Sequence, residues 1–183
     1  MLVTYAAGER EARAAAREGA VVVVDAFRVS TTIAVLVRKG ARVVPVASIE
    51  EATTYPGVDY RIGERGSEKL PGFDFGNSPT EVEVATLIPG ATVVLSTTNG
   101  TRIVEAAHGA PAVLTGAFVN AHAVADALAT GESGARVAVI GCGWEGHRAS
   151  EDESAAGTIL HRLHAKGAKL DERARRGFVP RAL

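Results

Sequence analysis

The sequence predicts an α/β domain in three layers, with helices on both faces of a largely parallel or mixed central sheet. Short apolar runs alternate with helical patterns, and polar or glycine-containing turns separate them. The run at residues 21–24 is valine at every position, which is typical of a strand buried on both faces. Such strands require a layer of helices on each side.

The elements follow from these patterns in chain order. Apolar runs rich in β-branched residues predict strands at residues 20–24, 42–46, 92–95, 112–114 and 136–140. Apolar residues at helical spacing predict helices at residues 30–39, 49–54, 101–107, 121–129 and 151–166.

Three stretches show other patterns. Residues 1–19 place charges among alanines and indicate one amphipathic helix without the apolar core of a signal peptide. Residues 61–79 are irregular and contain several glycines and prolines, so we expect an ordered, functional loop there. The basic stretch 166–181 is expected to be a solvated helix and terminus.

Composition restricts the function classes. With 183 residues, 46% of them hydrophobic, the chain suits a single domain over residues 1–183. The net charge of -1, from 20 basic and 21 acidic residues, provides no global field for nucleic acid or an anionic membrane. The single cysteine, Cys142, excludes an internal disulfide and fits a reducing compartment. We therefore expect a cytoplasmic protein with neither a nucleic-acid nor a membrane partner.

Polar side chains follow the expected strands where the strands end, the edge at which parallel sheets bind ligands. Asp25 and Arg28 follow the strand at 20–24, and their spacing suits one metal ligand and one phosphate clamp. The nearby hydroxyls of Ser30 and Thr31 favour this interpretation. The alternative is a helix cap with a surface ion pair.

The segment Thr97–Thr101 lies between a strand and a helix and combines hydroxyls, an amide and a glycine. Donors at the start of a helix bind phosphate, so the segment is a candidate anion site. An ordinary turn at Asn99 and Gly100 is the alternative. The charged and polar residues of the long loop either line a site or form a solvated surface; they are Glu64, Arg65, Lys69, Asp74, Asn77 and Ser78.

The segment around Cys142 matches two further patterns. Residues 141–146 fit G-x-G-x-x-G, but the second strand and acidic ribose ligand of a dinucleotide site are missing. Cys142 and Arg148 have the Cys-x5-Arg spacing of a cysteine phosphatase. Glu145, inside that loop, would repel phosphate. A buried, inert cysteine is the alternative.

Glu151 and Asp152 open the last long helix. Acidic residues in a first helical turn complement the helix dipole, and adjacent carboxylates also suit Mg²⁺.

Together these segments resemble the 2-phosphosulfolactate phosphatase family, the ComB-like Mg²⁺-dependent phosphatases. Several segments carry the resemblance in order, at residues 25–33, 63–66, 72–79, 96–101, 116–121 and 150–157. The resemblance implies an α/β enzyme that hydrolyses a phosphate ester of a sulfonated lactate, a step towards coenzyme M. Relative to the family, we expect the chain to be short at its C-terminus. A homo-oligomeric assembly is a further possibility.

The resemblance also implies roles. We expect Asp25, Glu151 and Asp152 to hold Mg²⁺, and Asp25, Arg28, Thr98 and Asn99 to be catalytic. The expected contacts to a small anionic phosphate ester are Ser30, Thr31, Glu64, Arg65, Lys69, Asn77, Ser78, Thr97, Gly100, Thr101 and Asn120. Two alternatives are a non-catalytic anion-binding relative and a cysteine-dependent phosphatase that uses Cys142.

Overall fold

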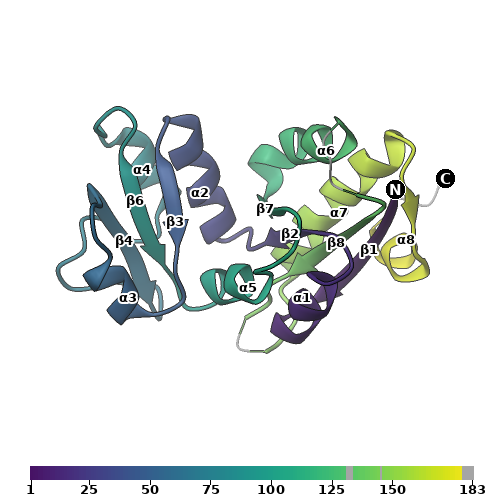
Figure 1. Cartoon of the computed structure of the whole chain (residues 1–183), viewed down its shortest axis with the longest axis horizontal. Helices are drawn as coiled ribbons and strands as arrows, with labels where there is room; N and C mark the ends of the chain where they lie inside the picture. Colours follow the sequence, from purple (N-terminus) through teal and green to yellow (C-terminus); the bar gives the residue numbers. More distant parts are fainter. Residues whose placement is uncertain (131–133, 145, 179–183) are drawn as a thin grey trace.

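The computed structural model describes residues 1–130, 134–144 and 146–178, and side chains up to residue 175. Two sheets lie side by side in separate halves of the molecule (Figure 1). The α/β class expected from the sequence is confirmed, with its strands divided between these two sheets.

The larger sheet has the strand order β7-β2-β8-β1-β9, and all its pairs are parallel. Its strands are β1 (Leu2–Ala7), β2 (Ala20–Val24), β7 (Val113–Gly116), β8 (Arg136–Gly141) and β9 (Lys169–Leu170). One face packs against α6 (Ala121–Thr130), α7 (Ser150–Ala165) and α8 (Glu172–Phe178). The other face packs against α1 (Glu9–Ala15) and α5 (Gly100–Ala106).

The smaller sheet has the order β3-β6-β4-β5, and only the β4–β5 pair is antiparallel. Its strands are β3 (Arg42–Pro45), β4 (Tyr60–Arg65), β5 (Glu68–Lys69) and β6 (Thr92–Ser96). Helices α2 (Val29–Arg38) and α4 (Pro79–Val84) contribute to one apolar cluster on this sheet, and α3 (Ile49–Thr54) contributes to another. A short 3₁₀ helix, Phe118–Asn120, follows β7.

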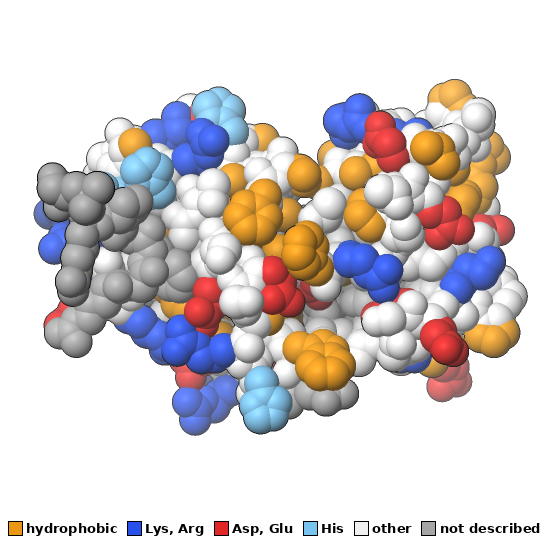
Figure 2. All heavy atoms as spheres, turned by 180° about the vertical axis from the view of Figure 1, so that it is seen from behind, with side chains coloured by type: hydrophobic (Ala, Val, Ile, Leu, Met, Phe, Trp, Pro, Cys, Tyr) orange, Lys and Arg blue, Asp and Glu red, His pale blue; other side chains and the backbone are white. Residues whose placement is uncertain are grey.

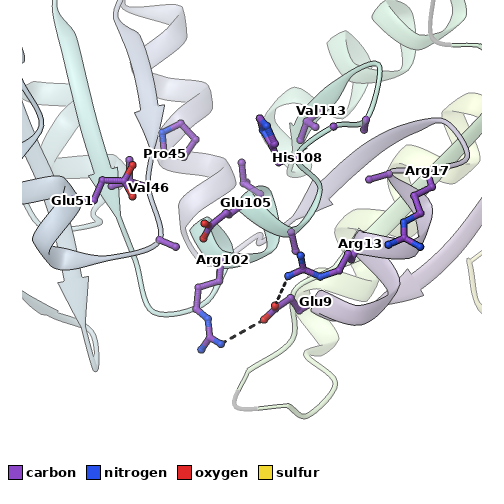
Figure 3. Close-up of a pocket in the computed structure, with 16 residues that line it drawn as sticks. Glu9, Arg13, Arg17, Pro45, Val46, Glu51, Arg102, Glu105, His108 and Val113 are labelled. Carbon is purple, nitrogen blue, oxygen red and sulfur yellow. Dashed lines mark hydrogen bonds and ion pairs between the residues drawn. The ribbon is translucent and has the colours of Figure 1, made fainter.

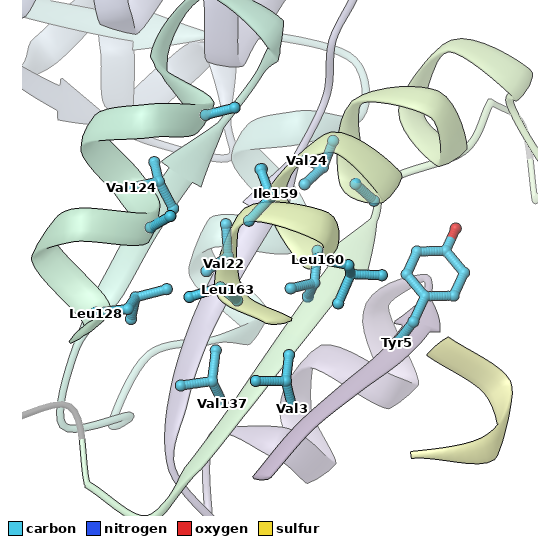
Figure 4. Packing of buried hydrophobic residues seen from close by; sticks show 14 of the residues in the cluster. Val3, Tyr5, Val22, Val24, Val124, Leu128, Val137, Ile159, Leu160 and Leu163 are labelled. Atoms are coloured by element: carbon cyan, nitrogen blue, oxygen red, sulfur yellow. The ribbon is translucent and has the colours of Figure 1, made fainter. Parts of the chain in front are cut away.

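The main core lies between the larger sheet and α7 (Figure 4). Every residue of β2 is buried, as its continuous apolar sequence predicts. Val22 and Val24 of this strand join the same apolar cluster as Ile159 and Leu160 of α7. Burying side chains of this size stabilises the fold by about 1.5–3 kcal/mol each. This core holds β2 and α7, which carry the first and last residues of the candidate site.

The structure corrects three sequence predictions. Residues 1–19 form a strand and a helix, because the apolar residues of β1 pair with β8 and bury Val3 and Tyr5. Gly8 separates the two elements with a φ of 87°, a conformation that glycine adopts at low cost.

The second correction concerns residues 61–79, which are not one loop. They contain most of β4, all of β5 and the start of α4, and β4 pairs with β6 inside the smaller sheet. The third concerns the basic tail. Leu170 and Ala174 are buried in the main core, so β9 and α8 are not simply solvated. The last tail residues, 179–183, lie outside the described residues.

Candidate active site

Asp25 and Asp152 meet at the carboxyl ends of β2 and β8, although 127 positions separate them in the sequence. Asp152 lies in the first turn of α7, and its Oδ1 accepts a hydrogen bond of 2.8 Å from the backbone N–H of Ala26. Its Oδ2 accepts one of 2.9 Å from the N–H of Gly143, beyond β8. These bonds fix the Asp152 carboxylate beside the residue that follows Asp25.

The environment of Asp25 disfavours its ionised form. Burial raises the pKa of Asp25 to about 7, and the negative charges of Asp152 and Glu64 act in the same direction. Hydrogen bonds from the backbone N–H groups of Val29 and Arg28 oppose this shift. The Val29 bond to Asp25 Oδ1 is 3.3 Å long. A perturbed carboxyl group of this kind is typical of functional sites.

Asp152 shows the same imbalance. Burial raises its pKa, and the hydrogen bonds from Ala26 and Gly143 only partly offset that effect. Neither Asp25 nor Asp152 forms an ion pair with a basic side chain among the described residues. A cation placed between the two carboxylates would therefore offset the negative charge that burial makes unfavourable.

The donor chemistry at this position suits Mg²⁺. Mg²⁺ prefers oxygen ligands and is commonly held by one or two carboxylates together with water and substrate phosphate. Asp25 and Asp152 fit this pattern. Within the described part of the chain, no three or more His, Cys, Asp or Glu side chains form a group that could hold a metal ion. The role predicted for Glu151 as a third ligand therefore stays a prediction.

Two basic side chains lie on segments that flank the site and are available to a ligand. Arg28 is the residue before α2, three positions after Asp25, and its guanidinium has no hydrogen bond or ion pair with another described residue. Lys69 on β5 is exposed and pairs in register with Glu64, and its ammonium also lacks such a partner. Both cations are free to bind an anionic ligand.

The turn between β6 and α5 is packed directly against Asp25. A Cβ atom added to Gly100 would lie 2.6 Å from Asp25 Oδ2 and 2.1 Å from Val29 Cγ1, so only glycine fits there. Thr97 and Thr101 bond to each other, because the Thr97 N–H donates to Thr101 Oγ1 at 3.2 Å and Thr101 Oγ1 donates to the Thr97 carbonyl at 3.1 Å. Their hydroxyls shape the turn, and their predicted contact with substrate stays a prediction.

Glu64 and Arg65 are held by protein groups at the end of β4. The Glu64 carboxylate accepts the N–H and the hydroxyl of Thr98. The Arg65 guanidinium donates to the carbonyl of Ala47 at 3.3 Å and to Ser96 Oγ at 3.0 Å. Burial lowers the pKa of Arg65. These contacts connect the ends of strands β3, β4 and β6.

Several predicted substrate contacts bond to the backbone. The Ser30 hydroxyl donates to Val23 O and accepts from the Asp25 N–H, and the Thr31 hydroxyl donates to Ala26 O. Ser78 caps α4 by accepting from the Glu81 N–H. The Asn120 amide accepts from the N–H of Ala117 and donates to Thr115 O. These side chains build the loops that carry the site.

Two predicted amides have unused hydrogen-bonding groups. The Oδ1 atom of Asn77 is buried and has no hydrogen-bond partner. Among the described residues, it is the one buried side-chain nitrogen or oxygen atom of which this is true. Asn99 precedes α5, and its side chain does not cap that helix. A buried amide oxygen without a partner is costly, which makes Asn77 Oδ1 a candidate acceptor for a donor such as a water molecule at the site.

Cys142 has the wrong environment for a nucleophile. Burial raises the pKa of its thiol well above the usual value, and the charges of Asp25 and Asp152 raise it further. A cysteine nucleophile needs the opposite shift. The G-x-G-x-x-G pattern does not open a helix directly, because Trp144 and His147 pair across a tight turn before α7 begins. Glu145 lies outside the described residues.

Sequence reasoning missed the hydrophobic side chains around the site. Phe27 follows β2, Phe118 follows β7 and Trp144 follows β8, and all three are exposed. Figure 2 shows acidic side chains in the middle of one face, with hydrophobic side chains around them and a groove between the two halves. Phe118, Phe27 and Trp144 come shortly after the neighbouring strands β7, β2 and β8, and this shared position is the sequence signal that could have identified them.

Tyr5 was also missed, because β1 was not recognised. Its hydroxyl lies 2.9 Å from the position of a Cβ atom added to Gly141, at the end of β8. Burial and the charges of Glu153 and Asp152 raise the pKa of Tyr5 to about 12. Tyr5 therefore stays protonated beside the Asp152 side of the site.

A large hollow lies elsewhere on the molecule, between α1, α5 and the end of β3 (Figure 3). Its volume is about 1280 Å³, and its lining contains none of the predicted site residues. Glu9 pairs there with Arg13 at 2.9 Å and with Arg102 at 3.5 Å. Because these charges compensate one another, the hollow is a weaker candidate for an anionic ligand than the Asp25 site.

None of the helices in the described ranges is long and apolar enough to cross a membrane.

The fold and the site define an α/β protein with paired carboxylates at the carboxyl ends of its strands. A profile of the family described as 2-phosphosulpholactate phosphatase matches residues 6–176. The chain belongs to this family, and the resemblance found in its sequence is confirmed.

Three relatives carry the name probable 2-phosphosulfolactate phosphatase. The protein from Parasynechococcus marenigrum (strain WH8102) is 41% identical over 170 residues, which are 89% of this chain and 69% of the relative. The protein from Synechococcus sp. (strain CC9605) is 42% identical over a match that covers 80% of this chain and 62% of the relative. The protein from Gloeobacter violaceus is 41% identical over a match that covers 82% of this chain and 65% of the relative. The chain thus spans between 62% and 69% of the length of these relatives.

Proposed function

We propose that this chain is a phosphatase that hydrolyses 2-phosphosulfolactate, or a closely related small anionic phosphomonoester, to sulfolactate and phosphate. The observation that carries the proposal is the fixed proximity of Asp25 and Asp152, in a chain whose relatives are named for this reaction. Coupled carboxylates, together with unpaired cations on the neighbouring segments, suit phosphoryl transfer, in which charge stabilisation is the main requirement.

Asp25 and Asp152 would hold Mg²⁺ in this proposal. When bound there, the ion would supply positive charge to the phosphoryl oxygens and lower the pKa of a bound water. The chain's own part is to hold the two carboxylates in place, and the backbone bonds from Ala26 and Gly143 orient Asp152 for this role. The positive charge of the bound ion would favour the ionised form of both carboxyl groups, which burial alone disfavours.

Arg28 and Lys69 are proposed to bind the anionic groups of the substrate. Arg28 is close in sequence to Asp25 and suits the phosphoryl group, because a guanidinium donates in a geometry that matches phosphate oxygens. Lys69 lies on the neighbouring hairpin and suits the sulfonate or the carboxylate. Asn99 and Asn77 are proposed to add amide contacts. Arg65 is a weaker candidate, because three strand ends already engage its guanidinium.

The wider assignment is part of the same proposal. The family name supports a small phosphate ester as the substrate, and the composition supports neither nucleic acid nor an anionic membrane as a partner. A cytoplasmic location, a place in coenzyme M biosynthesis and a homo-oligomeric assembly are expectations from the resemblance.

Phosphate release from 2-phosphosulfolactate tests this function. We expect turnover with Mg²⁺, loss of activity in EDTA and recovery when excess Mg²⁺ is added. Full activity in EDTA would refute the role of the metal. A comparison with 2-phospholactate, which lacks the sulfonate, tests the role of Lys69, because Lys69→Ala should raise KM more for the sulfonated ester. Absence of turnover on both esters would leave an anion-binding relative as the better interpretation.

A further inference from the structure

Glu64 is a buried carboxylate that binds two different turns of the smaller-sheet half. Its side chain is 7% exposed, and it lies on β4. Its Oε1 accepts the backbone N–H of Thr98 at 2.8 Å. Its Oε2 accepts the backbone N–H of Ser67 at 2.8 Å and the Thr98 hydroxyl at 3.3 Å. Both oxygens are therefore occupied by protein donors.

The two turns carry different parts of the proposed site. Thr98 belongs to the turn between β6 and α5, in which Gly100 is packed against Asp25. Ser67 belongs to the two-residue turn between β4 and β5, the strand that carries Lys69. Glu64 thus joins the turn that packs against Asp25 to the hairpin that carries Lys69.

The conformation of Ser67 shows that the second turn needs support. Its φ is 70°, which is uncommon for a residue other than glycine. The preceding residue, Gly66, also has a positive φ of 59°, so the hairpin has the backbone of a tight type I′ turn. The hydrogen bond from Ser67 N–H to Glu64 holds this turn against β4.

A direct contact between Glu64 and the substrate is disfavoured. The proposed substrate is an anion with several negative charges, and a carboxylate with no basic partner among the described residues would repel it. The neighbouring Arg65 attracts this carboxylate electrostatically, since the charge of Glu64 raises the pKa of Arg65, but the two side chains form no ion pair. The guanidinium donates instead to the Glu64 carbonyl, to Ala47 O and to Ser96 Oγ. We therefore assign the Glu64 side chain a role in holding the two turns, through its bonds to Ser67 and Thr98.

We propose that Glu64 is a positioning residue of the phosphatase site, which holds the β6–α5 turn and the β4–β5 hairpin in the arrangement that binds the phosphoryl group. This inference rests on the proposed function for its effect on turnover. Its effect on the binding of inorganic phosphate can be measured without turnover.

The experiment compares Glu64→Gln with Glu68→Gln. Glu68 lies on the same hairpin and is exposed, so its substitution is the matched control. Glutamine keeps the size of Glu64, has one acceptor oxygen and loses the charge. The measurements are kcat and KM for 2-phosphosulfolactate, and the affinity for inorganic phosphate from its protection against thermal unfolding.

We expect Glu64→Gln to fold, to bind phosphate about tenfold or more weakly and to lose about tenfold to a hundredfold in kcat, the loss expected when a charged acceptor is removed from buried donors. Glu68→Gln should stay within about twofold of the natural protein in both measurements, as is usual for a surface substitution. A merely structural role would lower the melting temperature and leave phosphate affinity and kcat unchanged in the folded variant. That result would overturn the proposal.

Thr98→Val provides a second route if Glu64→Gln does not fold. It removes the weaker bond to Glu64 and keeps the Thr98 N–H, so we expect about a threefold loss of phosphate affinity. An unchanged affinity in Thr98→Val would then overturn the proposal. If the natural protein binds phosphate but hydrolyses neither ester, the phosphatase function fails while a weaker affinity in Glu64→Gln still supports positioning.

Discussion

Replacing Asp25 with asparagine should stabilise the metal-free protein at pH 8. Burial, Asp152 and Glu64 raise the pKa of Asp25 from 3.8 to about 7, so the folded state binds this proton more tightly than the unfolded state. The stability associated with the protonated carboxyl is complete below pH 4 and is lost as pH rises towards 7. Asparagine keeps the size and the acceptor oxygen, and it does not ionise.

The difference between 3.8 and about 7 corresponds to about 4 kcal/mol at 1.36 kcal/mol per pH unit. Because Asp25 is partly accessible, solvent screens some of this cost, and we expect Asp25→Asn to be more stable by about 2–4 kcal/mol at pH 8. The gain should shrink towards zero near pH 4. Asp152 titrates in both proteins, so the difference between them isolates the contribution of Asp25 and its coupling to Asp152.

The assay is urea unfolding of both proteins in EDTA at several pH values between 4 and 8. Asp126→Asn is the control, because a hydrogen bond from Lys166 lowers the pKa of Asp126 below 3.8, so its contribution is lost only on acidification below pH 4 and its difference from the natural protein should stay nearly constant between pH 4 and 8. Added Mg²⁺ should stabilise the natural protein more than Asp25→Asn. An Asp25→Asn gain that does not change with pH, or a loss of stability at pH 8, would refute the reasoning.

Three further substitutions test neighbouring parts of the site. Arg28→Ala should lower kcat/KM by about a hundredfold, as expected for one transition-state donor, whereas the exposed Arg42→Ala should not; equal losses would exclude Arg28 from the site. Cys142→Ser should keep most of the activity measured with Mg²⁺, and a folded but inactive serine variant would restore the cysteine mechanism. Gly100→Ala should destabilise the fold by about 1–3 kcal/mol in urea unfolding, since its Cβ would lie 2.1 Å from Val29 Cγ1. Gly76→Ala, with 3.6 Å to its nearest neighbour, is the control, and equal stability of the two variants would contradict the packing at Gly100.

The central strands and most helices were predictable because their sequence patterns are local. The valines of β2 and the periodic residues of α2 and α7 indicate their own conformations. Strand β1 was not recognised, because its apolar run is short and alanines and charges follow it at once. Strand β4 was hidden in the same way, since its glycine and charged residues suggest a loop until its pairing with β6 is known.

The positions of the site residues were easier to predict than their contacts. Asp25, Asp152 and Arg28 follow from the rule that parallel sheets bind ligands beyond the carboxyl ends of their strands. The pattern could not show that Thr97 and Thr101 bond to each other, or that Glu64 accepts from Thr98. Those contacts depend on the three-dimensional arrangement of side chains that are far apart in the sequence.

The most direct test of the central claim is the rate of phosphate release from 2-phosphosulfolactate, measured with saturating Mg²⁺ for the natural protein, Asp25→Asn and Asp152→Asn. The paired-carboxylate site predicts measurable turnover for the natural protein and a loss of about a hundredfold or more for each folded variant, comparable with removing one transition-state interaction. Asp126→Asn, at an exposed position on α6, should keep its activity. Turnover that survives in either site variant at the natural rate would contradict the account.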